Sequence, residues 1–93
     1  MNREAAKSLA VEALSFLAND LDRFGRFLAL TGINPNEIRA LARDSEFLVA
    51  VLDHVLSDQS LLQAFASETR CNPADLGAAR TALGGRPWER DVP

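Results

Sequence analysis

Hydrophobic residues recur along the chain at spacings of three and four, and no segment alternates strictly between apolar and polar positions. This spacing is typical of amphipathic α-helices, which have 3.6 residues per turn, and not of half-buried β-strands. We therefore predict an all-α fold, a compact bundle of five to six short helices. The predicted helices cover about residues 3–18, 20–31, 34–43, 45–56, 58–69 and 72–83.

The predicted helices differ in how much of their surface is apolar. Helices 3–18 and 45–56 carry broad apolar arcs, which are typical of central, largely buried helices. Helix 20–31 has a narrower arc, and we expect it to face the core. This arc consists of Leu21, Phe24, Phe27 and Leu28.

The clearest boundary between helices lies near position 34. Asn34 is a favoured N-cap residue, and Pro35 follows at the first helical position, where its missing N–H costs nothing. Glu37 completes a pattern that resembles a capping box. Gly32 is placed to end the preceding helix in the left-handed conformation. These residues predict a tight corner between two helices.

The same signature returns 38 positions later at Asn72-Pro73, which suggests an internal repeat. Aligning residues 7–45 with 45–83 gives eight identities, although two unrelated amphipathic stretches could also align this well. We predict two tandem three-helix units. The identities are Val11/Val49, Leu14/Leu52, Asp20/Asp58, Phe27/Phe65, Thr31/Thr69, Asn34/Asn72, Pro35/Pro73 and Ala40/Ala78.

Length and composition agree with one small globular domain. The chain has 93 residues, of which 47% are hydrophobic and 25% charged, and this balance argues against disorder. We expect a single helical domain over residues 1–83, with units at about 3–43 and 44–83. Gly84-Gly85 then leads into a C-terminal tail over residues 84–93.

The charge and the cysteine count indicate the environment. The net charge of −3 disfavours nucleic acid and anionic membrane surfaces as general partners. No apolar run approaches the roughly 18–20 residues that a membrane-spanning helix needs, and the first residues lack the features of a signal peptide. Cys71 is the only cysteine, so no internal disulfide can form. We therefore predict a cytoplasmic protein.

Candidate catalytic chemistry is sparse. His54 is the only histidine, with Asp58 one helical turn later, but no second histidine and no Cys-x-x-Cys motif accompanies them. Cys71 occupies an apolar position before the last helix, where a small apolar side chain is expected. We predict no catalytic residue, no bound metal and no cofactor, and we predict that the protein is not an enzyme.

Two features are candidates for an interaction surface. Leu30 falls on the polar side of helix 20–31, between Arg23 and Arg26, where an exposed leucine can anchor a partner. Trp88 lies in the tail, where it either docks on its own domain or contacts a partner. Single exposed leucines are also ordinary surface residues. The predicted interaction surface is Arg23, Arg26, Leu30 and Trp88.

Two alternative functions remain open at this stage. The corner within residues 20–43 has the length of a DNA-binding helix-turn-helix, although Leu28 and Pro35 do not suit that motif. A nucleic-acid regulator built on this corner would use Arg23, Arg26, Arg39 and Arg43. The other alternative is an enzyme with a helical pocket near His54.

Three sequence runs together resemble a known family: Gly25 to Pro35, Phe47-Leu48-x-x-Val51-Leu52-Asp53, and Leu61-Leu62-x-Ala64-Phe65. They resemble an uncharacterised family of short bacterial proteins, mostly alphaproteobacterial, known as a domain of unknown function. The resemblance covers about residues 3–83 and implies a bacterial cytosolic protein. It implies no activity, cofactor or site residue.

The function is therefore unknown from sequence alone. The sequence favours a non-enzymatic cytosolic domain that acts through protein–protein contacts, as a small regulator or adaptor. Its partner is either another protein or a second copy of the chain.

Overall fold

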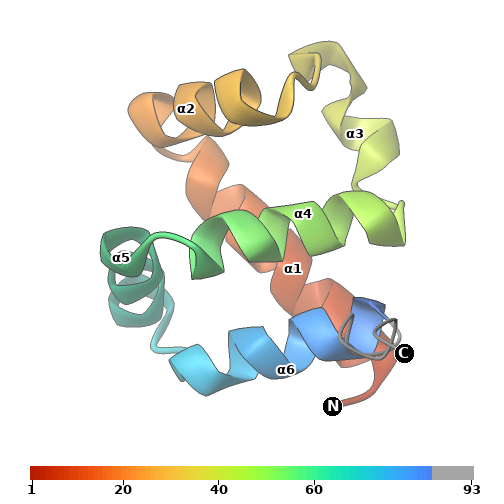
Figure 1. The fold of residues 1–93 in the computed structure, drawn as a ribbon, viewed down its shortest axis with the longest axis vertical. Helices are drawn as coiled ribbons and strands as arrows, with labels where there is room; N and C mark the ends of the chain where they lie inside the picture. Colours follow the sequence, from red (N-terminus) through yellow and green to blue (C-terminus); the bar gives the residue numbers. More distant parts are fainter. Residues whose placement is uncertain (85–93) are drawn as a thin grey trace, which may run out of the picture.

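A computed structural model describes residues 1–84 of the chain, and all of its regular structure is helical. The prediction of an all-α bundle is confirmed (Figure 1). The elements are α1 (Arg3–Ala18), α2 (Leu21–Thr31), the 3₁₀ turn η1 (Pro35–Glu37), α3 (Ile38–Leu41), α4 (Ser45–Leu56), α5 (Gln59–Thr69) and α6 (Pro73–Gly84).

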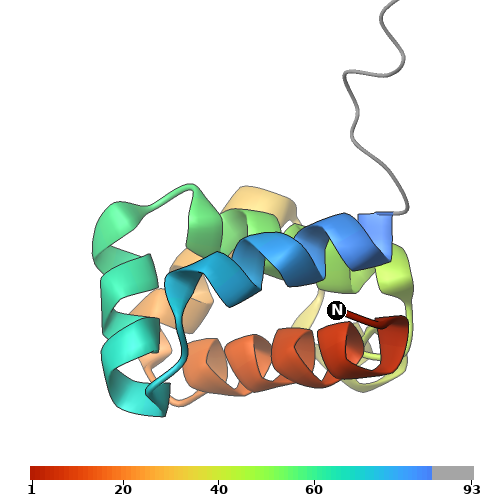
Figure 2. The same cartoon turned by 90° about the horizontal axis from the view of Figure 1, so that it is seen from below.

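The core lies where α1, α4 and α6 meet, as the two perpendicular views show (Figures 1 and 2). Leu17 of α1, Leu48 and Leu52 of α4, and Leu76 of α6 are all fully buried. Burying one such side chain contributes roughly 1.5–3 kcal/mol. Helices α1 and α4 thus occupy the central position that their broad apolar arcs predict.

Helices α2 and α5 flank this core, and each contributes one fully buried phenylalanine. Phe27 of α2 packs edge-on against the His54 ring of α4, with ring centroids 5.1 Å apart. Phe65 of α5 packs edge-on against Phe16 of α1 at 5.3 Å. Each flanking helix is therefore held by an aromatic contact to the central helix of the other half of the chain.

Side-chain caps begin most of the helices, and the cap that the sequence predicts at Asn34 is among them. Asp20 Oδ1 accepts hydrogen bonds from the backbone N–H groups of Asp22 and Arg23 at 3.0 and 3.2 Å. Asn34 Oδ1 accepts from the N–H of Asn36 at 2.9 Å. At the end of α2, Gly32 has a φ of 72°, so the predicted left-handed cap is present.

The helix predicted at residues 34–43 is present over residues 35–41, but it is shorter than predicted and begins as a 3₁₀ turn. After Asn34 the chain makes the 3₁₀ turn η1 and then only the four residues of α3, none of which is buried. The segment stops early because Asp44 already caps α4 by accepting from the N–H of Glu46 at 2.9 Å. A four-residue helix is a poor match for the recognition helix of a helix-turn-helix.

Within residues 1–84, none of the helices combines the length and the apolar character that crossing a bilayer requires. The matching caps and aromatic contacts of the two halves agree with an internal repeat, and the repeat itself stays a prediction.

Candidate functional site

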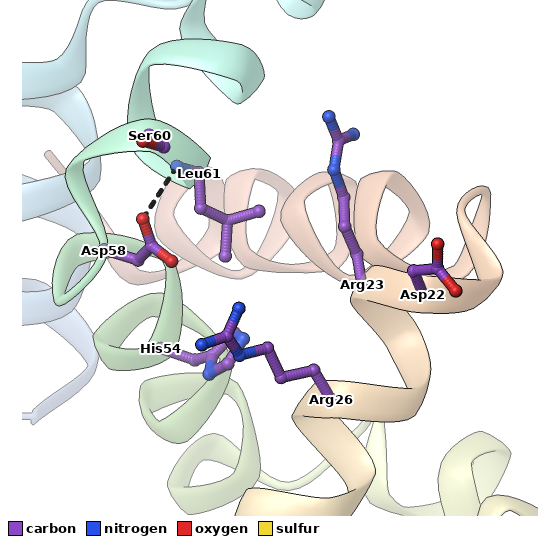
Figure 3. A pocket seen from close by; sticks show the side chains of 7 residues that line it. All are labelled: Asp22, Arg23, Arg26, His54, Asp58, Ser60 and Leu61. Atoms are coloured by element: carbon purple, nitrogen blue, oxygen red, sulfur yellow. Dashed lines mark hydrogen bonds between the residues drawn. The ribbon is translucent and has the colours of Figure 1, made fainter.

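A surface pocket lies between α2 and the corner that joins α4 to α5 (Figure 3). Its volume is about 240 Å³, and it contains two of the four residues predicted for an interaction surface, Arg23 and Arg26. It also reaches His54. The lining residues are Asp22, Arg23, Arg26, His54, Asp58, Ser60 and Leu61.

Helix geometry and capping place these side chains. Asp22 and Arg26 are one turn apart on α2 and so lie on the same side of the helix. Asp58 caps α5 by accepting from the backbone N–H of Leu61 at 3.2 Å, which fixes the first turn of α5 at the pocket wall. In Figure 3 the Arg26 guanidinium leans toward His54, whereas the carboxylate of Asp22 points away from it.

The surroundings of His54 in this pocket favour the neutral form of its imidazole. Burial is the largest cause that lowers the pKa of His54 below its ordinary 6.5, and the positive charge of Arg26 lowers this pKa further. The carboxylate of Asp58 opposes both effects. Because the edge of Phe27 packs against the ring, His54 belongs partly to the core and partly to the pocket.

The pocket offers recognition groups of several kinds. Arg26 supplies hydrogen-bond donors, a neutral imidazole supplies one donor and one acceptor, and Leu61 supplies an apolar wall. Among the described residues, no cluster of three or more His, Cys, Asp or Glu side chains is arranged to hold a metal ion. The hydrogen bonds found within residues 1–84 include none between Ser60 and His54.

Arg23 and Arg26 have different surroundings although both line the pocket. Arg23 is held by the fold: its guanidinium lies 3.4 Å from Glu68 Oε2 and 3.8 Å from Asp20 Oδ2, and it stacks over the Phe16 ring at 4.6 Å. No ion pair of Arg26 occurs within the described part of the chain. Of these two arginines, Arg26 is therefore the one that is available to a partner.

The exposed leucine that the sequence predicts is present. The side of α2 that carries Leu30 faces solvent, and Leu30 is 69% exposed. It lies one turn after Arg26, so the structure places these two residues on one surface. Trp88, the fourth predicted residue, lies outside the described residues.

Leu21 corrects the sequence analysis, which assigns it to the buried arc of α2. Leu21 is 86% exposed. Phe27 sets the direction in which α2 faces the core, and Leu21 lies roughly 120° around the helix from it. The signal that could have revealed this is Gln59, a polar residue at the corresponding position of α5.

Cys71 lies at the corner between α5 and α6, half-buried against the core. Burial raises the pKa of the Cys71 thiol, and the nearby Asp75 and Glu12 carboxylates raise it further. A thiol with a raised pKa is a poor nucleophile at neutral pH. This agrees with the apolar packing role that the sequence predicts for Cys71.

The fold and the pocket define a small all-α domain with a partly polar recess on its surface. The chain belongs to the family described as "Protein of unknown function (DUF3572)", which it matches over residues 3–86. The predicted membership of a domain of unknown function is thus confirmed. Comparisons with curated proteins and with solved structures find no match.

Proposed function

We propose that this chain is a non-enzymatic domain that acts through protein–protein contacts, and that the exposed side of α2 makes those contacts. The observation that carries the proposal is Leu30, a leucine 69% exposed one turn after Arg26. Arginine is enriched among the residues that dominate binding energy at interfaces, and covering the exposed leucine beside it would remove apolar surface from water.

The helix at the corresponding place in the second half supports this assignment. Helix α5 begins with an aspartate cap and buries one phenylalanine, as α2 does. Yet α5 carries Glu68 at the position that corresponds to Leu30. A helix in this setting therefore folds with a charged residue there, so the fold itself does not require the leucine of α2.

The pocket beside Leu30 adds specificity to such a surface. Arg26 stands between the pocket and Leu30, so one partner segment could contact the guanidinium and the leucine together. Arginine side chains present planar donors that favour carboxylates. We therefore expect the partner to bring an acidic side chain next to an apolar one.

Affinity capture from the native host, followed by mass spectrometry, tests the proposal. The bait is the full chain as wild type, Leu30→Glu or the control Val11→Glu, which changes a residue of α1 that is 39% exposed. We expect proteins that wild type and Val11→Glu retain and that Leu30→Glu loses at unchanged helicity. Identical retention by all three baits would contradict the proposal.

The pocket at His54 favours a second candidate function, the binding of a small molecule. Its test uses the only histidine of the chain as a probe. A ligand in the pocket would shift the imidazole proton resonances of His54, and Arg26→Gln would weaken the effect. Screens that leave these resonances unmoved would count against this function.

The proposal extends to the location and the origin of the chain. We infer a bacterial, cytoplasmic protein, supported by the resemblance of its sequence runs and by its single cysteine. We also infer that residues 7–45 and 45–83 arose as an internal repeat, supported by their identities and by the matching caps of Asn34 and Asn72.

A further inference from the structure

We propose that α2 is the contact surface of a homodimer, in which two copies pack their α2 helices antiparallel about Gly25. This inference rests on the proposed function, in that α2 is the contact helix, and it names a partner: a second copy of this chain. It is centred on Leu21, Gly25 and Ala29, beside the row that contains Leu30, and it shares Arg26 with the proposed interaction surface.

The outer side of α2 is open along its whole length. Leu21, Gly25 and Ala29 follow one another at intervals of four, and all three are exposed. Leu21 is the most exposed of the large hydrophobic residues in the described chain, at 86%. Covering this side chain with a neighbouring molecule would remove its apolar surface from water, which is favourable.

Gly25 has no evident role within its own fold. A Cβ atom added at Gly25 would meet nothing within 4 Å, and its φ is not positive. Glycine inside a helix lowers helix stability relative to alanine. The corresponding position of α5 holds Gln63, so this place in the fold tolerates a long side chain. A glycine does, however, allow the backbone of a second helix to approach closely.

The charges on this side of α2 are self-complementary. Asp22 and Arg26 lie one turn apart on the flank of the row that contains Gly25, and neither forms an ion pair within residues 1–84. A two-fold axis makes every contact occur twice, so a single pair of opposite charges can satisfy both copies. Arg26 leans toward His54 in the free chain (Figure 3) and would turn outward by side-chain rotation.

A two-fold axis through Gly25 brings these features into register. Leu21 comes to lie opposite Ala29 of the partner subunit. Asp22 of one copy and Arg26 of the partner subunit lie on the same flank of the contact. They are offset by two residues, or about 3 Å along the helix axis at 1.5 Å per residue. The length of an arginine side chain covers this offset. The contact between two 11-residue helices is small, so we expect a weak, concentration-dependent dimer.

Sedimentation of the full chain over a range of concentrations tests the dimer by charge exchange. Asp22→Arg and Arg26→Asp each place like charges opposite one another, so each should raise the dissociation constant at least about tenfold. The double variant Asp22→Arg/Arg26→Asp restores opposite charges and should return the constant to within about threefold of wild type. Gly25→Leu should also disrupt the dimer while leaving the helical circular dichroism signal intact.

Several outcomes would overturn the dimer. These are a wild type that stays monomeric at every concentration, a double variant no better than the single ones, and a Gly25→Leu protein that dimerises normally. Asp22→Asn, which keeps a helix-compatible polar side chain, replaces Asp22→Arg if the latter fails to fold. The proposed function is judged separately by Leu30→Glu, which changes none of the residues that the dimer requires: a monomeric wild type that still captures a partner through Leu30 refutes only the dimer.

Discussion

The corners after α2 and α5 use the same capping chemistry but lead to different elements. Asn34 Oδ1 accepts from the N–H of Asn36 at 2.9 Å, and Asn72 Oδ1 accepts from the N–H of Ala74 at 3.0 Å, with a proline directly after each asparagine. The first corner opens into η1 and the four-residue α3, whereas the second opens into α6, which has 12 residues.

The difference lies in the apolar residues beyond each cap. Helix α6 buries Leu76, Ala79 and Leu83, a stripe that spans two turns and packs against both α1 and α4. In the first half, the position that corresponds to Leu83 is Ser45, which already belongs to α4. A cap therefore fixes where a helix can begin, and the length of its apolar stripe determines whether it is completed and buried.

The largest expected effect concerns the feature that the two halves share. Phe27→Ala and Phe65→Ala each remove a fully buried ring that packs edge-on against an aromatic partner. We expect each variant to lower the free energy of unfolding by about 3–5 kcal/mol in chemical denaturation. Similar losses would support equivalent roles, and a loss below about 1 kcal/mol in either variant would refute them.

A second pair of variants tests where the halves differ. Leu76 is fully buried in α6, while its counterpart Ile38 in α3 is half-exposed. Leu76→Ala should cost about 2–5 kcal/mol by leaving a cavity in the core. Ile38→Ala should cost clearly less, about 1 kcal/mol, because solvent already reaches its side chain. Equal losses in denaturation midpoints would show that α3 contributes to the core as α6 does.

The sequence predicts helix starts well because a cap depends on nearby residues. Asp20, Asp44 and Asp58 each accept a backbone N–H within the next three residues, so their identity and position suffice. The early end of α3 was harder to predict, because it depends not only on the local cap at Asp44 but also on the absence of a third apolar turn that could pack against α4.

The candidate site shows the same division between local and non-local information. Leu30 could be placed on the polar side of its helix from spacing alone. Only the comparison with Gln59 in the second half signals the exposure of Leu21. Spacing alone does not reveal this exposure, because it depends on Phe27 turning α2 toward His54 in another helix. The same holds for Arg23, whose guanidinium is held by Glu68, a residue 45 positions away.

A smaller effect is expected at the ends of α2 and α5. Gly32 and Arg70 occupy corresponding positions, and both are left-handed, with φ values of 72° and 58°. A side chain costs roughly 1 kcal/mol in this conformation, and glycine avoids that cost. Arg70→Gly should therefore raise the melting temperature, and Gly32→Ala should lower it. If both substitutions lowered the melting temperature, the side-chain contacts of Arg70 would contribute more to stability than its left-handed backbone conformation costs.

The smallest expected effect concerns an aromatic position at which the halves differ in chemistry. His54 stands where the first half has Phe16, and each ring receives the edge of a phenylalanine from a flanking helix. The pKa of His54 is lowered by burial and by Arg26, with Asp58 opposing, so the unfolded chain binds the proton more readily than the folded one. Asp22 and Arg23 are the other charged groups that line the pocket.

The sign of the resulting pH dependence is set by that lowered pKa. Above the ordinary pKa of 6.5 the ring is neutral in both states, and the stability of the fold does not depend on its protonation. As the pH falls below 6.5, protonation of the unfolded chain lowers the free energy of unfolding, until the folded protein is protonated as well. We therefore expect wild type to lose stability as the pH falls from about 6.5 to 5 in denaturant titrations. His54→Phe, which copies Phe16, should lose less over the same interval, and the matched control Gln59→Ala should behave as wild type. A His54→Phe protein with the same pH slope as wild type would show that other groups carry the dependence, and that histidine and phenylalanine are equivalent at this position.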